Sequence, residues 1–253
     1  GMRTPAYVGL TERILSNTVA RIAQKKAWRY IGSYWVDEPW FPDPCARGNV
    51  MYTGHLMMLM ALHEALSGHP LFNREGVELV WDDAHRFIYT TTRLADVSAE
   101  QIRAGKGGIT CEPGLVFFAC NNHPHVTFRL LEGMGYGAWQ AESEKWERWA
   151  LAGLRATAGG GAFRLVHHEK SGLSMPRGMP GFDGWCLLWY EPWASGPTNS
   201  RRLWRLAKKK INWDELLQAP VEQPERVECS DCCNPVKVPT AATVSFLAAA
   251  ARA

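Results

Sequence analysis

The residues best suited to chemistry begin with two thiols. Cys111 and Cys120 stand nine positions apart, and Glu112 follows the first of them. A thiolate is a nucleophile, a thiol can pass on a proton, and a neighbouring carboxyl group shifts the thiol pKa in a direction set by its own charge. The pattern fits proton-transfer or nucleophilic chemistry. It fits equally well two buried structural cysteines beside a capping glutamate.

A histidine in an apolar helix is the second candidate. Met51 and His55 are one turn apart in a predicted helix over residues 50–67, so they share a face. The residues after His55 are almost all apolar, which places the imidazole in apolar surroundings. It is either a core histidine bonded to a backbone carbonyl or a proton donor and acceptor beside an apolar substrate. Methionines suit both interpretations, because they pack around variable shapes.

Helices are the elements expected to position these groups. Hydrophobic spacing and Gly or Pro stop signals predict helices over 10–30, 50–67, 74–92, 113–132, 138–157, 200–218 and 240–252. A short helical turn is expected at 96–103, a partly helical stretch at 182–192 and a short strand at 163–166. Pro113 suits a first helical turn, so Cys111 should lie at a helix N-terminus, where the dipole eases thiol ionisation. Pro124 should kink the same helix.

This rhythm of helix, loop and helix predicts an all-α fold. Paired helices of similar length favour stacked helical hairpins, as in an (α/α) toroid or an incomplete (α/α)6 barrel. The length of 253 residues fits a single domain over 1–253.

Composition and motif spacing exclude several classes of partner. A net charge of +3 and a pI near 8.5 are too mild to indicate nucleic acid, and the basic run over 201–210 is interpreted as a solvated helix face. No apolar run suits a membrane span. No secretory signal is present, so we expect a cytoplasmic chain or one whose leader was removed. No metal site is expected: His167 and His168 lack matching carboxylates. The remaining candidates for zinc are Cys229, Cys232 and Cys233, which lack a second ligand pair, and their redox state is left open.

Several motifs, in order, resemble the linalool dehydratase/isomerase family. The first is Asn49-Val50-Met51-Tyr52-Thr53-Gly54-His55-Leu56. The second is Cys111-Glu112-Pro113, then Phe118, then Cys120-Asn121. The third is Gly161-Ala162-Phe163, followed by His168 and Ser171-Gly172. The loop from Trp35 to Pro44 is also similar. The resemblance covers about 27–200 and, more faintly, the chain to 252.

The resemblance implies an (α/α) toroid whose inner helices surround an apolar pocket. Such enzymes interconvert a tertiary and a primary allylic monoterpene alcohol and dehydrate the tertiary one, with no metal or organic cofactor. The catalytic residues it implies are His55, Cys111, Cys120 and Glu112. The pocket residues expected around a small apolar substrate are Met51, Tyr52, Phe118, Asn121, Phe182, Asp183 and Trp185.

The chain also departs from the family pattern. The family has further N-terminal helices that supply an aspartate and a tyrosine, and a last hairpin that is not evident here. Phe182 and Asp183 stand where a tyrosine is expected. We therefore expect an incomplete toroid or one closed by a partner chain, and a homo-oligomer fits the family.

Two other functions suit a tryptophan-rich helical toroid. One is a non-catalytic module that binds a hydrophobic ligand. The other is a carbohydrate-active enzyme, which needs a pair of carboxylates across a cleft. The candidate acids for that pair are Asp37, Glu38, Asp43 and Glu112.

Overall fold

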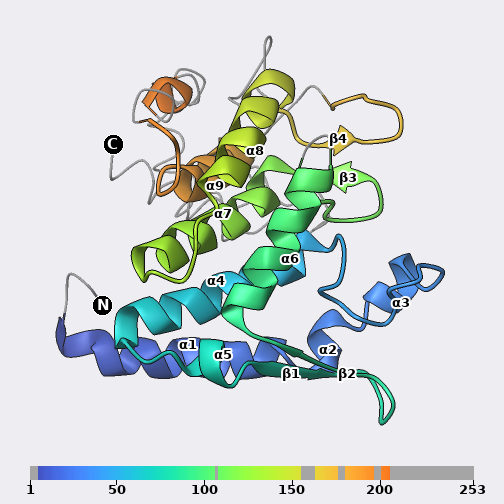
Figure 1. The fold of residues 1–253 in the computed structure, drawn as a ribbon. Coiled ribbons are helices and arrows are strands. Elements are labelled where there is room, and N and C mark those ends of the chain that lie inside the picture. The colour runs from blue at the N-terminus through green and yellow to red at the C-terminus, as the bar shows by residue number, and fades with distance from the viewer. Residues whose placement is uncertain (1–4, 106–107, 155–162, 176–179, 197–200, 206–253) are drawn as a thin grey trace, which may run out of the picture.

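Helices make up most of the fold. The computed structural model describes residues 5–105, 108–154, 163–175, 180–196 and 201–205 (Figure 1). A 3-10 turn at Pro5–Tyr7 precedes α1 (Val8–Ile22), α2 (Lys25–Trp28), α3 (Ile31–Tyr34), α4 (Val50–Ser67), α5 (Leu71–Arg74), α6 (Thr91–Ala104), α7 (Phe118–Gly133), α8 (Gln140–Gly153) and α9 (Pro180–Tyr190). Two small two-stranded antiparallel sheets accompany them: β1 (Val77–Val80) with β2 (Arg86–Tyr89), and β3 (Leu115–Val116) with β4 (His167–His168). The helical prediction is confirmed, with these small sheets as additions. Closure into a toroid stays an expectation.

Helix α4 is the central element of the described fold. It packs against α1 on one side and α7 on the other, and α9 packs on α7 (Figure 1). The predicted stop signal is confirmed: Gly68 has φ +74 and its N–H donates to the Glu64 carbonyl at 2.9 Å. Although α4 is highly apolar, no helix in the described ranges has both the length and the apolar character needed to cross a membrane.

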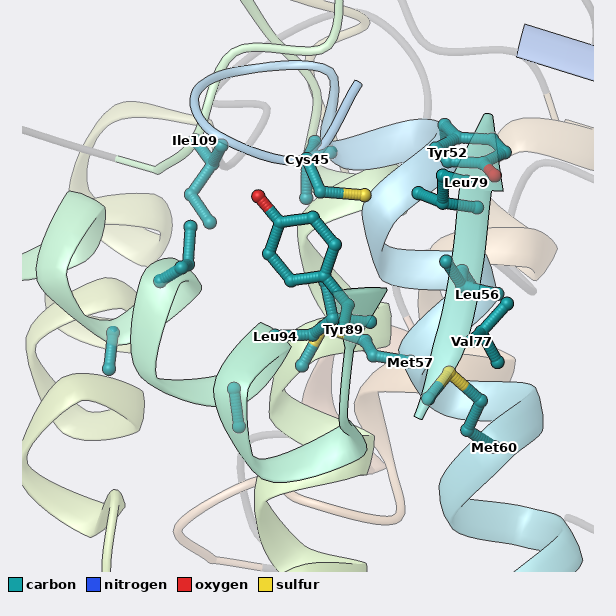
Figure 2. Close-up of a cluster of buried hydrophobic side chains, with 14 of the residues drawn as sticks. Cys45, Tyr52, Leu56, Met57, Met60, Val77, Leu79, Tyr89, Leu94 and Ile109 are labelled. Carbon is teal, nitrogen blue, oxygen red and sulfur yellow. The ribbon is translucent and has the colours of Figure 1, made fainter. Parts of the chain in front are cut away.

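Two hydrophobic clusters flank this central helix. The first joins α4 to the β1–β2 hairpin and α6, and Figure 2 shows Cys45, Tyr89 and Leu94 converging within it. The second lies among α7, α8 and α9, with Phe118, Trp146 and others fully buried. Because α4 and α7 contribute to both clusters, the surface between these two helices is fixed from both sides.

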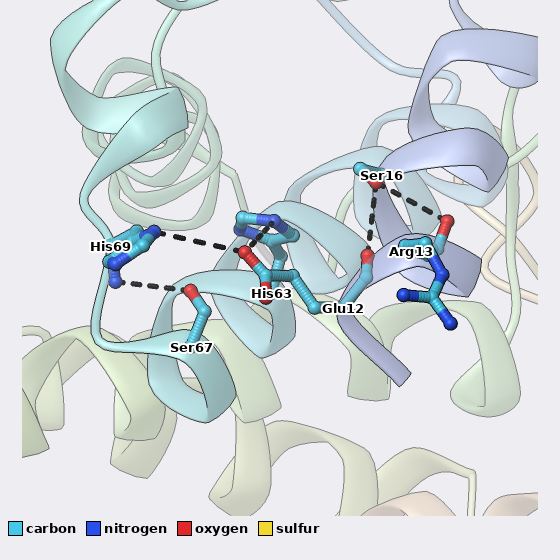
Figure 3. Close-up of polar contacts among 6 residues, drawn as sticks. All are labelled: Glu12, Arg13, Ser16, His63, Ser67 and His69. Carbon is cyan, nitrogen blue, oxygen red and sulfur yellow. Dashed lines mark hydrogen bonds and ion pairs between the residues drawn. The ribbon is translucent and has the colours of Figure 1, made fainter. Parts of the chain in front are cut away.

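Polar contacts hold α1 to the end of α4. Glu12 of α1 lies between His63 of α4 and His69, with its Oε1 atom 3.8 Å from a ring nitrogen of each (Figure 3). The His63 side chain is buried, whereas that of His69 is exposed. The His63 imidazole is therefore committed to the α1 side of α4.

The predicted helix over 74–92 is wrong. Helix occurs only at the ends of that range, where α5 finishes at Arg74 and α6 begins at Thr91, and Gly76, with φ +73, turns the chain into the β1–β2 hairpin. Val77 and Leu79 are buried, while Glu78 between them is exposed, which is the alternation of a half-buried strand. β-Branched and aromatic residues in this run favour strand pairing over the helical spacing that the sequence also allows.

The helix predicted over 113–132 begins later, at Phe118. Residues Cys111 to Leu115 form a tight turn instead, in which Gly114 takes φ +74 and the Cys111 N–H donates to the Leu115 carbonyl at 2.8 Å. The chain then enters β3, which pairs Leu115 with His168. Pro113 therefore occupies a turn and not a first helical turn.

Candidate active site

The two candidate thiols lie in contact. The Sγ atoms of Cys111 and Cys120 are 3.3 Å apart, and both residues are buried. The hydrogen bond to Cys120, burial, and the nearby Glu112 carboxyl group together raise the pKa of the Cys111 thiol well above its usual value. Cys111 therefore keeps its proton at neutral pH, and the structure brings three of the four predicted catalytic residues together.

The expected helix-dipole effect on Cys111 is wrong. Cys111 precedes β3 rather than a helix, because α7 begins seven residues later at Phe118. Cys120 is the thiol that lies in the first turn of α7. The pKa of Cys111 is accordingly raised, and not lowered as the helix N-terminus would predict.

Asn121 of α7 forms hydrogen bonds with the segment that precedes the turn from Cys111 to Leu115, called the thiol turn below. Its side-chain carbonyl accepts from the Ile109 N–H at 2.7 Å, and its amide donates to the carbonyls of Ile109 and Phe117, each at 2.9 Å. Asn121 is fully buried, and these contacts occupy its polar atoms. It holds the approach to Cys111 in place, which is a structural role alongside the substrate contact expected from the sequence.

We expect Asn121→Ala to lower the free energy of unfolding by about 3 kcal/mol, because it leaves buried backbone groups of Ile109 without partners. Denaturant unfolding measures this loss. Gln140→Ala is the matched control: it removes an exposed amide that donates to the exposed Glu144, and should change stability by less than about 0.5 kcal/mol. Equal losses of stability in the two variants would show that the hydrogen bonds of Asn121 to Ile109 do not stabilise the fold.

His55 presents one ring nitrogen as a base. Its Nδ1 lies 2.6 Å from the Met51 carbonyl oxygen one turn back, so in the neutral ring Nδ1 carries the proton and Nε2 carries the lone pair. Burial lowers the pKa of His55 and favours this neutral form. The carbonyl bond expected of a core histidine is thus present, and it leaves Nε2 available for proton transfer.

His123, which the sequence analysis did not single out, joins His55 to the thiols. The two imidazole rings have centroids 4.0 Å apart, and His123 Nδ1 lies 3.0 Å from the Cys120 carbonyl oxygen. Gly54 allows this approach of α4 and α7, since a Cβ there would lie 3.0 Å from the His123 Cβ and 3.2 Å from Pro124 Cδ. His55 and Cys120 therefore belong to one helix–helix interface.

Buried neutral histidines make the fold sensitive to acid. Burial lowers the pKa of His55, lowers that of His123 well below its usual value, and lowers that of His125 to about 3. Below pH 6.5 these histidines are protonated in the unfolded chain but stay neutral in the folded chain. The stability present above this pH is therefore lost as the pH falls.

Between pH 6 and 5 we expect the free energy of unfolding to fall by about 1.4 kcal/mol per pH unit for each histidine that stays neutral in the folded chain. Urea unfolding at successive pH values measures this slope. His125→Gln should make the slope shallower by one such step, because His125 is fully buried. An unchanged slope in that variant would contradict the assignment.

The remaining predicted pocket residues divide between two places. Met51 is exposed at the start of α4, while the Tyr52 hydroxyl donates to the Ile22 carbonyl of α1 at 3.0 Å. The others belong to the second cluster or its edge. Phe118 packs on Phe163 with ring centroids 4.1 Å apart. Buried Phe182 and partly buried Trp185 lie in the same cluster.

Asp183 is buried in α9. One carboxylate oxygen accepts from the Phe163 N–H at 2.9 Å. Its charge and that of Cys120 both raise the pKa of the buried Cys186 thiol, after the larger effect of burial. Cys186 is therefore within electrostatic reach of both Asp183 and Cys120, and the sequence analysis did not identify it.

Tyr30 is a second neighbour found only in the structure. Its hydroxyl donates to Asn49 Oδ1 at 2.5 Å. Burial raises its pKa, and the Cys111 thiol and the Glu112 carboxyl group raise it further. The phenol therefore stays protonated near the thiol turn. Sequence offered no signal for it, because Tyr30 lies outside the motifs.

Two of the carboxylates considered for sugar chemistry, Asp43 and Glu112, have other contacts. Asp43 accepts from the Tyr89 hydroxyl at 2.7 Å and from the Cys45 N–H at 3.0 Å, so it braces the loop before α4. Burial raises its pKa. Glu112 adjoins Cys111 instead. Asp43 thus serves the loop structure, and Glu112 belongs to the thiol site.

Two further features complete the description of the predicted candidates. A pocket of about 110 Å³ is lined by Arg129, Gln140, Ser143, Glu144, Glu147, Trp193 and Ser195, none of which was a predicted site residue. His167 and His168 bond Ser174 and Ser171 within the β4 turn. In the ranges that the structure describes, no group of three or more potential ligands suits a metal ion. Cys229, Cys232, Cys233 and the Gly161-Ala162 motif lie outside those ranges.

Fold and site together define a helical protein with a buried thiol pair and, along the same helix–helix interface, the contacting imidazoles of His55 and His123. The family model described as linalool dehydratase/isomerase matches residues 1–252, and the chain belongs to this family. Membership indicates an enzyme of the hydro-lyase and isomerase kind, with a small apolar terpene as the kind of substrate.

Proposed function

We propose that this protein dehydrates or isomerises an allylic isoprenoid alcohol at the Cys111–Cys120 pair, with His55 as the base and with no metal or organic cofactor. The single observation that carries the proposal is the 3.3 Å contact between two buried thiols from separate elements. Family membership supports the kind of reaction and of substrate.

The thiol pair is suited to give up one proton. When one thiol protonates the leaving hydroxyl group, the remaining proton lies between two sulfur atoms only 3.3 Å apart. The resulting thiolate is then stabilised by a hydrogen bond from its neighbour. A single buried thiol would lack that donor and would leave an uncompensated charge in an apolar environment.

Dehydration balances with His55 as the proton acceptor. The C–O bond breaks as the thiol proton moves to the hydroxyl oxygen, which gives water and an allylic cation. His55 Nε2 then removes a proton from an adjacent carbon, which forms the new double bond. Transfer of that proton from His55 back to the thiolate restores both groups. Isomerisation follows when water adds instead to the other end of the allylic cation and its surplus proton returns to the thiolate.

An apolar enclosure favours this route, since it keeps stray water from the cation. Aromatic faces stabilise positive charge, and Phe118, Phe182 and Trp185 supply them in the adjoining cluster. Glu112 is proposed to keep the Cys111 thiol protonated between turnovers, because the carboxyl group helps to raise the pKa of that thiol.

The proposal is tested by incubating the reduced protein with linalool and with geraniol and following alcohol exchange and triene formation by gas chromatography. We expect turnover by the wild type and none above background by Cys111→Ala. Binding of these alcohols without turnover would favour the non-catalytic ligand-binding module. Failure to bind any isoprenoid alcohol would reject the proposed substrate class.

A further inference from the structure

His123 is a fully buried imidazole with an uncommon arrangement of its two nitrogens. Nδ1 lies 3.0 Å from the Cys120 carbonyl oxygen, so it carries the proton of the neutral ring. Nε2 is buried and has no hydrogen-bond partner in the part of the chain that the structure describes. Both ring nitrogens of a buried histidine usually form hydrogen bonds. Hydrogen bonding alone therefore does not explain why this ring is buried.

Pro124 explains the Nδ1 contact. In α7 the Cys120 carbonyl would normally accept from the backbone N–H four residues later, but that residue is Pro124, which has none. The His123 side chain supplies the missing donor. Pro124 therefore leaves the Cys120 carbonyl without a backbone donor, and the His123 side chain replaces that donor. This hydrogen bond holds the His123 ring in its Nδ1–H tautomer.

The ring itself is in contact with His55. The planes are tilted by 37° at a centroid separation of 4.0 Å, and the Trp189 ring centroid lies 5.6 Å from that of His123. Burial, and then the charge that His55 would carry, lower the pKa of His123. His123 therefore presents a neutral ring to His55 at neutral pH.

We propose that His123 is a positioning residue: its ring face keeps the His55 ring in the rotamer in which Nδ1 donates to the Met51 carbonyl, so that Nε2 can accept a proton. This role rests on the proposed function of His55 as the base. The hydrogen bond to Cys120 fixes the His123 ring, and the fixed ring in turn fixes His55.

Pro124→Ala separates the two roles of His123. An alanine at position 124 restores a backbone N–H for the Cys120 carbonyl, so His123 can be replaced without leaving that carbonyl unpaired. In this background, His123→Leu removes the flat ring, whereas His123→Phe retains it. Both substitutions are apolar and remove both nitrogens, which makes them a matched pair. Pro124→Ala alone is the reference.

We expect melting temperatures of the two double variants to stay close to the reference. With linalool, the Leu variant should lose about tenfold to a hundredfold in kcat with little change in KM, while the Phe variant should stay within about threefold. Two-bond ¹H–¹⁵N spectra should show the Nδ1–H tautomer of His55 in the reference and the Phe variant, and a tautomer mixture in the Leu variant.

Retention of kcat and of the His55 tautomer in the Leu variant would overturn the proposal, because His123 would then serve only the Cys120 carbonyl. Equal losses in both double variants would also overturn it, since a nitrogen and not the ring face would be required. If the reference shows no turnover but the tautomers follow the ring, the positioning role stands and the proposed reaction fails.

Discussion

Replacing either thiol of the pair should nearly abolish turnover. We expect Cys111→Ala and Cys120→Ala each to lower kcat by about a thousandfold or more, and the double variant to be no slower than the worse single one. Residues that act as a unit give such non-additive losses. The reason is geometric: each sulfur lies 3.3 Å from the other, so removing one deprives the remaining thiolate of its donor.

Cys45→Ala is the matched control for these variants. Cys45 is also fully buried, in the first cluster, but its backbone N–H bonds to Asp43 and it was not placed in the proton-transfer machinery (Figure 2). Its kcat should stay within about threefold of the wild type. Initial rates measured under reducing conditions compare these four variants with the wild type. Comparable losses in Cys45→Ala would show that the cysteines matter through packing alone.

Removing the base should have the next largest effect. His55→Asn keeps a side-chain donor for the Met51 carbonyl but has no basic nitrogen to accept a proton, and we expect kcat to fall by about a hundredfold to ten-thousandfold. In the wild type, activity should persist as the pH falls below 6.5 and then decline, because burial lowers the pKa of His55. The variant should lack that decline.

His63→Asn tests whether any buried histidine of α4 would give the same result. His63 lies two turns further along the helix, and its ring faces Glu12 of α1 (Figure 3). Its substitution should leave kcat within about twofold and preserve the acid decline of the pH–rate profile. A loss as large as that of His55→Asn would place the effect in the packing of α4 and not in proton transfer.

The sequence predicted a helix correctly where its apolar residues have helical spacing and do not also fit a strand. The α4 helix, its stop at Gly68 and the shared face of Met51 and His55 follow from apolar spacing and a glycine stop, and all are present. The run over 74–92 misled because Val77, Val80 and Phe87 fit both a helical and a strand pattern. The pairing of β1 with β2 decided between the two, and a partner strand is not visible in a local window.

The site was predictable in its residue types but not in its geometry. The motifs named His55, Cys111 and Cys120, yet the turn at Gly114 and the later start of α7 reversed the expected shift of the Cys111 pKa. His123 was missed although a signal existed: a histidine directly before a proline inside a helix can donate to the carbonyl that the proline leaves open.

The most direct test of the thiol–imidazole site is a crystal structure with a saturated, unreactive analogue of linalool. We predict that its hydroxyl oxygen lies within about 3.5 Å of a sulfur of Cys111 or Cys120, with its hydrocarbon chain toward His55 and the second cluster. An analogue seated elsewhere, such as the pocket lined by Ser143 and Glu147, with the thiol pair still closed against itself, would contradict the assignment of this site.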